Sequence, residues 1–397
     1  WAPYESASAL NSSSWSTLWR VTTTEILNGP LRSTKSAAAR WSIARRAVSV
    51  RDRDGTLPTE VLDAARSRGL TTALVPPAFG GGGASHAETG VMLRELARSD
   101  PSAAVTLSMH SHLVAFQVWR HHHGQDASPL FEKVVGGAYL VSTGASDWVS
   151  SGGSARKVDG GYRVSARKSP ASGCEMGTVL VTSIRWEQAG AGPQVLHCAI
   201  PFSAEGVSVE QTWDTVGLRA TGSHTVVLDD VFVPDTAVSL VRPADVWHPV
   251  WNAIMGAAMP LIMAAYAGIA DAAVASALEA VRGRSEDHLF QIAGEMTNAH
   301  LRASDAVDAM FSEADDLRFE NTDGLAARIL SRKTTAAEGF IETVRLAGEL
   351  VGGRAFSRGH DLERLYRDVQ GAVFHPLPRA RQTRLSGRVA LGLTPVA

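Results

Sequence analysis

The feature that most constrains this chain is the order in which its residue patterns change along the sequence. Residues 57–119 show the apolar spacing of amphipathic helices, whereas residues 139–234 form short Val-, Thr- and Ser-rich runs separated by glycine-containing turns. From residue 243 onwards the chain returns to alanine-rich helical periodicity, in segments long enough for three or four helices. The sequence therefore predicts a helical part, an antiparallel β part and a helical bundle, an order that few architectures have.

These shifts in composition also set the expected domain boundaries. Residues 1–40 are an N-terminal extension that is rich in Ser and Thr, and its role stays open. We expect an N-terminal helical domain at residues 41–138, a β domain at residues 139–242 and a C-terminal helical bundle at residues 243–397.

Charge and cysteine content narrow the class of partner. The 38 Lys and Arg residues nearly balance the 40 Asp and Glu residues, and a net charge of -2 provides no broad positive field for nucleic acid or an anionic membrane. A small-molecule partner is expected instead. The two cysteines, Cys174 and Cys198, argue against a disulfide framework and favour the cytoplasm.

Two further patterns invite interpretations that we set aside. The apolar run at residues 254–275 contains Pro260 and Asp271, so we predict a buried helix rather than a membrane span. Three adjacent histidines, residues 121–123, point in different directions on a helix and lack acid or cysteine partners at ligand spacing. We therefore predict no metal site.

Four local motifs occur in one order along the chain. They are the proline- and glycine-rich loop at residues 76–81, the helical segment at residues 94–98, the strand and its exit at residues 218–234, and the paired segments at residues 350–353 and 362–368. From about residue 57 onwards the chain resembles the acyl-CoA dehydrogenase superfamily, including its flavin-dependent monooxygenase branch. The resemblance implies an α+β fold, mainly α, with an N-terminal helical domain, a central antiparallel β-barrel domain that binds flavin and a C-terminal four-helix bundle. It also implies a homodimer or homotetramer.

The resemblance carries a flavin site onto particular residues of the β domain. In the family, a strand end contacts the pyrimidine edge of the flavin, and the matching residues here are Val141 and Ser142, with Thr143 as the nearest alternative. The family also places a hydroxyl at flavin N5, where this sequence has Ser172 followed by Gly173.

Other family positions concern the diphosphate of FAD. Arg284 falls at the position of an arginine that clamps it, and a guanidinium suits a pyrophosphate. Gly352 and Gly353 match a loop through which a neighbouring subunit approaches the same dinucleotide. Glu349 stands where the family usually has a neutral glutamine, and a carboxylate there is unfavourable beside pyrophosphate. We therefore expect FAD, with FMN as the alternative.

The carboxylate base of the family is missing from both of its usual positions. Pro376 occupies one of them, and Ala258 occupies the other. Three interpretations stay open. His375 could accept the proton in a dehydrogenase, a reduced-flavin monooxygenase on the same fold needs no such base, or the chain could be a non-catalytic flavin-binding scaffold.

Three residues are candidates for the substrate side of the site. His110 and His112 lie on a helix that faces the substrate cavity in the resemblance, although either could be a core histidine, and Pro376 is the third candidate. Taken together, the sequence predicts a flavin-dependent oxidoreductase of acyl-CoA dehydrogenase type that acts on an acyl-CoA or acyl-like substrate, with the monooxygenase as the alternative.

Overall fold

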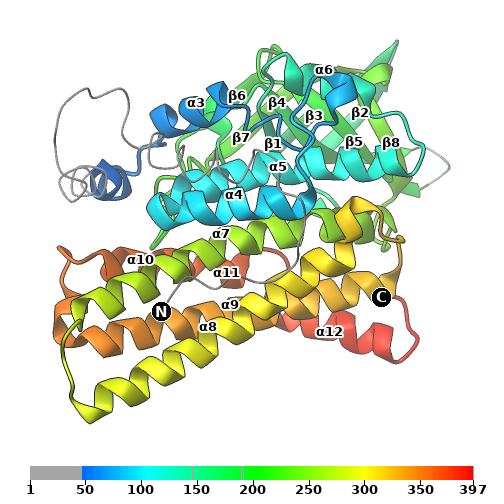
Figure 1. Cartoon of the computed structure of the whole chain (residues 1–397). Coiled ribbons are helices and arrows are strands. Elements are labelled where there is room, and N and C mark those ends of the chain that lie inside the picture. Colours follow the sequence, from blue (N-terminus) through cyan, green and yellow to red (C-terminus); the bar gives the residue numbers. More distant parts are fainter. Residues whose placement is uncertain (1–46, 145–146, 189, 191, 397) are drawn as a thin grey trace.

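A computed structural model describes residues 47–144, 147–188, 190 and 192–396 of the chain (Figure 1). The predicted N-terminal extension, residues 1–40, lies outside the described residues. In Figure 1 the sheet, the helices α4 and α5, and the C-terminal helices follow one another from top to bottom.

The first part of the described chain is helical, as the apolar spacing predicts. Helix α4 starts at a capping box, in which the Ser85 hydroxyl accepts a hydrogen bond from the Glu88 backbone N–H and the Glu88 carboxylate accepts one from the Ser85 N–H. Asp100 caps α5 in the same sense through the Ala103 N–H. The elements here are α3 (Thr59–Ser67), the 3-10 helix η1 (Pro77–Phe79), α4 (His86–Ser99), α5 (Pro101–His122) and α6 (Ser128–Val135).

Eight strands follow and form one sheet. The strands are β1 (Leu140–Ser142), β2 (Ser154–Val158), β3 (Gly161–Lys168), β4 (Val179–Gln188), β5 (Gly192–Pro201), β6 (Val207–Glu210), β7 (Thr225–Pro234) and β8 (Val238–Pro243). Their order is β6-β7-β3-β2-β4-β5-β8, with β1 pairing with β4. Two short 3-10 helices, η3 (Cys174–Met176) and η4 (Asp235–Ala237), interrupt the connections.

The predicted antiparallel barrel is wrong in its closure. Strands β6 and β8 lie at opposite ends of the sheet and are not hydrogen-bonded to each other. The pairing is also not wholly antiparallel, because β1 and β2 each pair with β4 in parallel, the second through the single pair Ala155 and Trp186. The β part is therefore an open, mixed sheet.

The rest of the chain is a C-terminal helical region. Its elements are α7 (Val250–Ala280), α8 (Asp287–Ala314), η5 (Asp315–Leu317), α9 (Asp323–Val351), η6 (Gly352–Phe356), α10 (Asp361–Val369), α11 (Gly371–Phe374) and α12 (Arg379–Ala390). Helices thus precede and follow the sheet along the chain, which agrees with the predicted α+β class.

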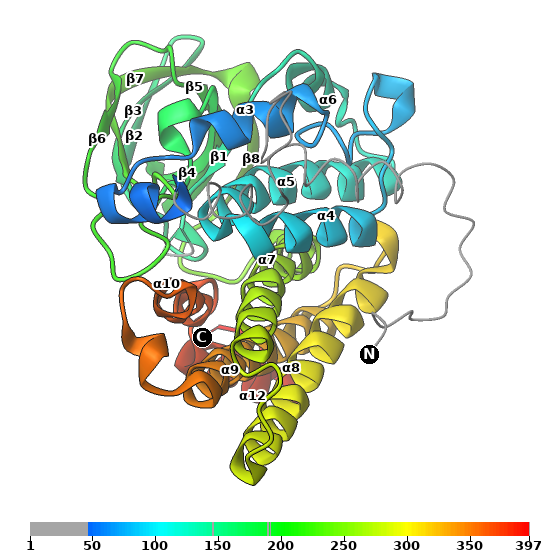
Figure 2. The same cartoon turned by 60° about the vertical axis from the view of Figure 1, so that its left-hand side comes forward.

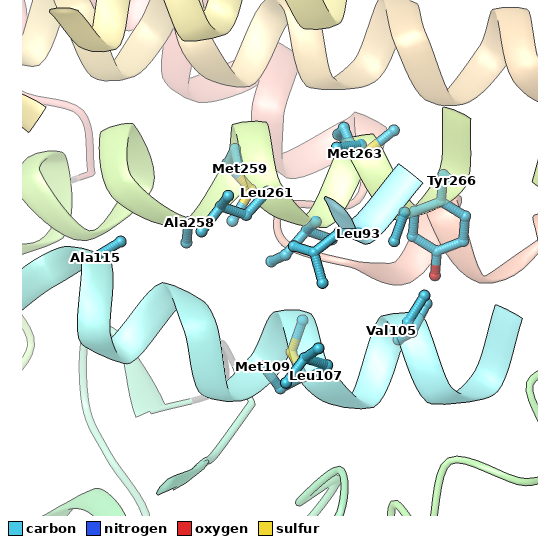
Figure 3. Close-up of a cluster of buried hydrophobic side chains, with 14 of the residues drawn as sticks. Leu93, Val105, Leu107, Met109, Ala115, Ala258, Met259, Leu261, Met263 and Tyr266 are labelled. Carbon is cyan, nitrogen blue, oxygen red and sulfur yellow. The ribbon is translucent and has the colours of Figure 1, made fainter. Parts of the chain in front are cut away.

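Helix α7 joins the two helical parts. It packs against α4 and α5 on one side and against α8 and α9 on the other (Figures 1 and 2). At Gly268 an added Cβ would lie 2.1 Å from the Arg94 carbonyl oxygen, so only glycine allows α4 to approach so closely. Figure 3 shows side chains such as Leu93, Val105 and Ala258 between these helices.

By length and composition α7 is the one helix of the described part of the chain that is apolar enough to cross a membrane. Of its most apolar window, 94% is buried inside the protein, and the core helix of a globular protein has the same composition.

Candidate active site

A cavity of about 600 Å³ lies where the sheet meets α5, α7 and the segment from α10 to the loop after α11. Aromatic and aliphatic side chains dominate its wall, among them Met109, Trp148, Trp213, Trp251, Ile254 and Phe374. A slot of this kind accepts the faces of a planar ring, while a few polar groups fix the orientation of the ring.

Half of the residues that the sequence nominated line this cavity. They come from four separate parts of the chain, and they are His112, Ser142, Thr143, Ser172, His375 and Pro376. The fold therefore brings the predicted pyrimidine-edge residues, the predicted N5 hydroxyl and the predicted substrate side together at one place.

Three other nominated residues are neighbours of the wall but do not line it. Val141 is fully buried in β1, and Gly173 has a φ of 72° and packs against Thr106 and Tyr139. His110 uses both ring nitrogens on backbone groups, since Nδ1 accepts from the Leu140 N–H at 3.0 Å and Nε2 lies 2.8 Å from the Thr71 carbonyl oxygen. His110 thus ties β1 to α5 as a core histidine.

The remaining nominated residues are far from the cavity wall of their own chain. Arg284 is half exposed between α7 and α8, where it pairs with Glu286 at 2.7 Å. Gly352 and Gly353 follow the end of α9, and an added Cβ at either would meet open space. The single chain does not bring these three residues to the cavity.

Both positions of the missing family base face the cavity, and neither carries an acid. Ala258 on α7 and Pro376 after α11 are part of the wall. Among the described residues Asp147 is the one carboxylate in the wall, and it is engaged by the Lys168 ammonium group at 2.8 Å and by the Thr143 hydroxyl at 2.9 Å. The site therefore lacks a free carboxylate that could remove a proton from a substrate.

A row of three hydroxyls lies along the cavity wall, on Ser172, Ser223 and Thr221. Ser172 Oγ lies 2.8 Å from Ser223 Oγ, which lies 2.7 Å from Thr221 Oγ1, and the Thr221 hydroxyl donates to the Leu218 carbonyl at 3.0 Å. Each contact needs one hydrogen, so only one arrangement satisfies all three: Ser172 donates to Ser223 and Ser223 donates to Thr221. Ser172 then faces the cavity as an acceptor.

The ring of His375 is held from behind by Tyr266. Nδ1 lies 2.6 Å from the buried Tyr266 hydroxyl and 3.3 Å from the Gly371 carbonyl oxygen. Burial lowers the pKa of His375 to about 4, so the ring is neutral at pH 7. The Tyr266 hydroxyl has no other acceptor among the described residues, so it donates to Nδ1. The proton of the neutral ring then sits on Nε2.

His112 has the opposite hydrogen-bonding sense. Its Nδ1 lies 3.2 Å from the Ser108 carbonyl oxygen and must donate to it, which leaves Nε2 as an acceptor. Burial lowers the pKa of His112 to about 4, so this ring too is neutral at pH 7. One neutral histidine therefore offers the cavity a donor and the other an acceptor.

Sequence reasoning missed an aromatic corner of the site. The rings of Trp148 and Trp251 stack at 5.3 Å, and the buried Arg242 guanidinium lies 5.4 Å from the Trp251 ring. Arg242 also donates to the carbonyls of Asp147 and Trp148, so it fixes the loop that carries both residues into the wall. The sequence signal was weak, because Trp148 lies about a hundred positions before Arg242 and Trp251 along the chain.

One polar atom in this corner has no partner within the described chain. Trp251 lines the cavity, and its Nε1–H is buried without an acceptor. A buried donor that lacks an acceptor costs about 1–3 kcal/mol, and because this nitrogen is not accessible from the cavity, a ligand in the cavity does not supply its acceptor.

Comparison with known proteins gives the same answer for the family. The family model described as "Acyl-CoA dehydrogenase, N-terminal domain" matches residues 30–127. The amino sugar nitrososynthase DnmZ of Streptomyces peucetius is 28% identical over 363 residues, which cover 86% of this chain and 88% of that protein. The "probable FMNH2-dependent monooxygenase SfnC" of Pseudomonas putida is 27% identical over 357 residues, which cover 84% of this chain and 88% of that protein.

A solved structure extends the match to the whole fold. The X-ray structure of KijD3 in complex with FMN and dTDP-3-amino-2,3,6-trideoxy-4-keto-3-methyl-D-glucose has a TM-score of 0.80 and 26% sequence identity, and the match covers 94% of each chain. Residues 30–127 thus match the N-terminal domain of the acyl-CoA dehydrogenase family, and the whole chain is similar in fold to KijD3.

These matches confirm the resemblance to the acyl-CoA dehydrogenase superfamily. The relatives named above are a nitrososynthase and a monooxygenase rather than dehydrogenases, and they favour the alternative that the sequence analysis kept open. The flavin in the KijD3 complex is FMN, which matches the second choice of cofactor, whereas FAD is not confirmed.

Proposed function

We propose that the chain is a monooxygenase that uses reduced flavin, of FMN type, bound in the cavity. The observation that carries this proposal is the pair Ala258 and Pro376, which face the cavity at both positions of the family base without a carboxylate. Dehydrogenation of an acyl thioester needs a base at the α carbon, while oxygenation does not.

The residues of the cavity fit a flavin ring. Ser142 and Thr143 supply hydroxyls at the end of β1, where both residues line the cavity. The surrounding tryptophan and aliphatic side chains suit the ring faces.

The hydroxyl row favours the reduced state of the ring. With its own proton given to Ser223, Ser172 can only accept a hydrogen bond from the cavity. Reduced flavin carries a hydrogen on N5 and can donate it, whereas oxidised flavin has an unprotonated N5 that needs a donor. Ser172 would therefore hold reduced flavin more tightly than oxidised flavin.

His375 is poorly suited to the dehydrogenase alternative. A base at the α carbon should have a pKa near the working pH, and burial holds the pKa of His375 at about 4. As a neutral ring whose Nε2–H faces the cavity, His375 instead donates a hydrogen bond to an oxygen atom.

Reduced flavin supplies two electrons to dioxygen, so that one oxygen atom enters the substrate and the other leaves as water. The chain's own side chains orient the reactants and exclude water. Trp148, Trp213 and Trp251, together with Met109 on α5 and Ile254 on α7, line the cavity and exclude water from it.

The wall also limits the substrate. Both charged side chains of the described wall are neutralised, Asp147 by Lys168 and Arg367 by Glu363 and by Asp52. An uncharged organic molecule therefore suits the interior better than an acyl-CoA. His112 Nε2 would accept an N–H or O–H from it, and the nitrososynthase relative acts on such a donor, an amino sugar.

Exposure of Arg284, Gly352 and Gly353 suits a role for these residues at the cofactor site of a neighbouring subunit. Because none of them lines the cavity of its own chain, we propose that they approach the flavin phosphate of a neighbouring subunit in a homodimer or homotetramer.

Two measurements test the proposal. Anaerobic titration should show tighter binding of reduced FMN than of oxidised FMN. With reduced FMN supplied by a flavin reductase, n-butylamine and dibenzothiophene as probes should be screened under labelled dioxygen, and product carrying one labelled oxygen atom is expected. Failure to bind either flavin below about 100 μM, a range weak for a cofactor, would overturn the proposal.

A further inference from the structure

The described part of the chain contains two fully buried lysines, Lys168 and Lys333, and their surroundings differ. Lys168 is 2% exposed and is neutralised by Asp147, with the Gly152 carbonyl as a further acceptor at 3.0 Å. Lys333 on α9 is 1% exposed and has no Asp or Glu partner among the described residues. Its Nζ donates to one carbonyl oxygen, that of Leu377, at 3.3 Å.

A buried ammonium group without a counter-ion costs free energy, and proteins keep such groups mainly where they serve a site. Burial lowers the pKa of Lys333 to about 8, so the group is still mostly charged at pH 7. Leu377 is two residues after His375, so the contact of Lys333 lies on the same loop as the cavity histidine.

We propose that Lys333 is a positioning residue that anchors the loop of residues 375–377 to α9 and places its positive charge behind the His375 ring at the cavity wall. Its meaning for catalysis rests on the proposed function, whereas the test below does not.

Contacts from three helices around His375 favour the neutral form of its ring. Tyr266 on α7 donates to Nδ1, and an added Cβ at Gly371 would lie 2.6 Å from the Tyr266 hydroxyl, so a glycine is needed there for this contact. After burial, the nearby charge of Lys333 is the largest cause that lowers the pKa of His375, and His112 on α5 adds to it. The Gly371 carbonyl acts weakly in the opposite sense.

The remaining ionisable group on this side is Asp368 on α10. It accepts from the Leu218 N–H at 2.6 Å and pairs with Arg364 at 3.0 Å, so its charge is engaged away from His375. Burial raises the pKa of Asp368 to about 6. Lys333 is therefore the one cation that acts on the ring from behind.

Histidine NMR of the full chain tests the proposal directly. With ¹³Cε1-labelled histidine and the His375 signal assigned by its loss in H375Q, the Lys333→Met variant should move the His375 titration midpoint upwards by about one pH unit. The Lys333→Arg variant keeps the charge and should titrate like the wild type. The exposed Lys133 on α6 is the matched control, and Lys133→Met should change nothing.

An unchanged His375 midpoint in a folded Lys333→Met protein would overturn the proposal. If that variant does not fold, the same measurement on the wild-type protein tests the proposal. Its His375 signal should shift between about pH 7 and pH 9.5 as Lys333 loses its proton, and a signal that stays still over this range refutes the coupling. None of these readouts depends on flavin, so a failed flavin titration would remove the proposed function without touching this result.

Discussion

Removing Asp147 should destabilise the protein far more than removing a surface carboxylate. The Asp147 side chain is 9% exposed and the Lys168 side chain 2% exposed, and the two groups lie 2.8 Å apart. In Asp147→Leu the Lys168 ammonium stays buried without a counter-ion, and the Thr143 hydroxyl and the Gly152 N–H lose an acceptor. Breaking a buried pair in this way costs about 3–5 kcal/mol of unfolding free energy.

The double variant separates the charge effect from packing. Asp147→Leu combined with Lys168→Met removes both charges and keeps the volume filled, and such replacements are often close to neutral. Because Gly152 still loses its partner, we expect a loss of about 1–2 kcal/mol and hence a coupling energy of at least about 2 kcal/mol between the two positions.

Urea unfolding of the four proteins of this cycle gives the coupling energy. As a control, Glu95→Ala removes an exposed partner of Arg98, where both side chains are nearly half exposed, and should cost less than about 0.5 kcal/mol. Additive losses in the Asp147 and Lys168 cycle would refute the claim that this pair neutralises the cavity wall.

Three further predictions concern the hydroxyl row, the histidine support and acid stability. Ser172→Ala should weaken reduced FMN by about 1 kcal/mol, roughly fivefold, and leave oxidised FMN nearly unchanged, as measured by anaerobic titration; equal losses would argue against the directional row. Gly371→Ala places a methyl group 2.6 Å from the Tyr266 hydroxyl and should lower turnover while flavin affinity survives, a split visible in parallel binding and rate measurements. Acid should unfold the protein early, because four histidines whose pKa burial lowers from 6.5 to about 4 bind protons more weakly folded than unfolded. Stability is then lost as pH falls from about 6.5 to about 4, with Asp368 opposing the trend because its pKa is raised to about 6. Urea midpoints at pH 7.5 and pH 5 check this, and a higher midpoint at pH 5 would contradict it; the four histidines are His86, His110, His112 and His375.

The order of helical and β parts followed from the sequence because each part carries its own periodicity. Apolar spacing fixes the buried face of α8, and the change to β-branched residues marks the start of the sheet at β1. Whether the sheet closes could not be predicted, because closure depends on which strands pair with each other. Strand β2, for example, pairs with β4 through one residue pair between segments about thirty residues apart.

Part of the candidate site could be predicted because its residues lie in local sequence motifs. Ser142, Ser172 and His375 each sit in a local motif that the family resemblance could place, and all three line the cavity. The protonation of His375 was beyond the sequence, because it depends on Tyr266 and Lys333, which lie on two other helices. A solvated histidine titrates near neutral pH, and burial makes His375 a much weaker base.

Other parts of the site could not be predicted because their residues come together from distant parts of the chain. The corner formed by Arg242, Trp148 and Trp251 depends on three separate segments meeting at the end of the sheet. His110 sits two residues before His112 on α5, yet only His112 lines the cavity, because helical neighbours two positions apart point to different sides.

The most direct test of the account is anaerobic mixing of the oxidised flavin-loaded protein with a saturating acyl-CoA while the flavin absorbance is followed. A base contributes about 10²–10⁴-fold to such a reaction, and Ala258 and Pro376 provide none. The account predicts that the flavin stays oxidised with every straight-chain thioester. Fast bleaching by a simple acyl-CoA, equally fast in His375→Ala, would show that a base exists elsewhere in the cavity and would contradict the monooxygenase proposal.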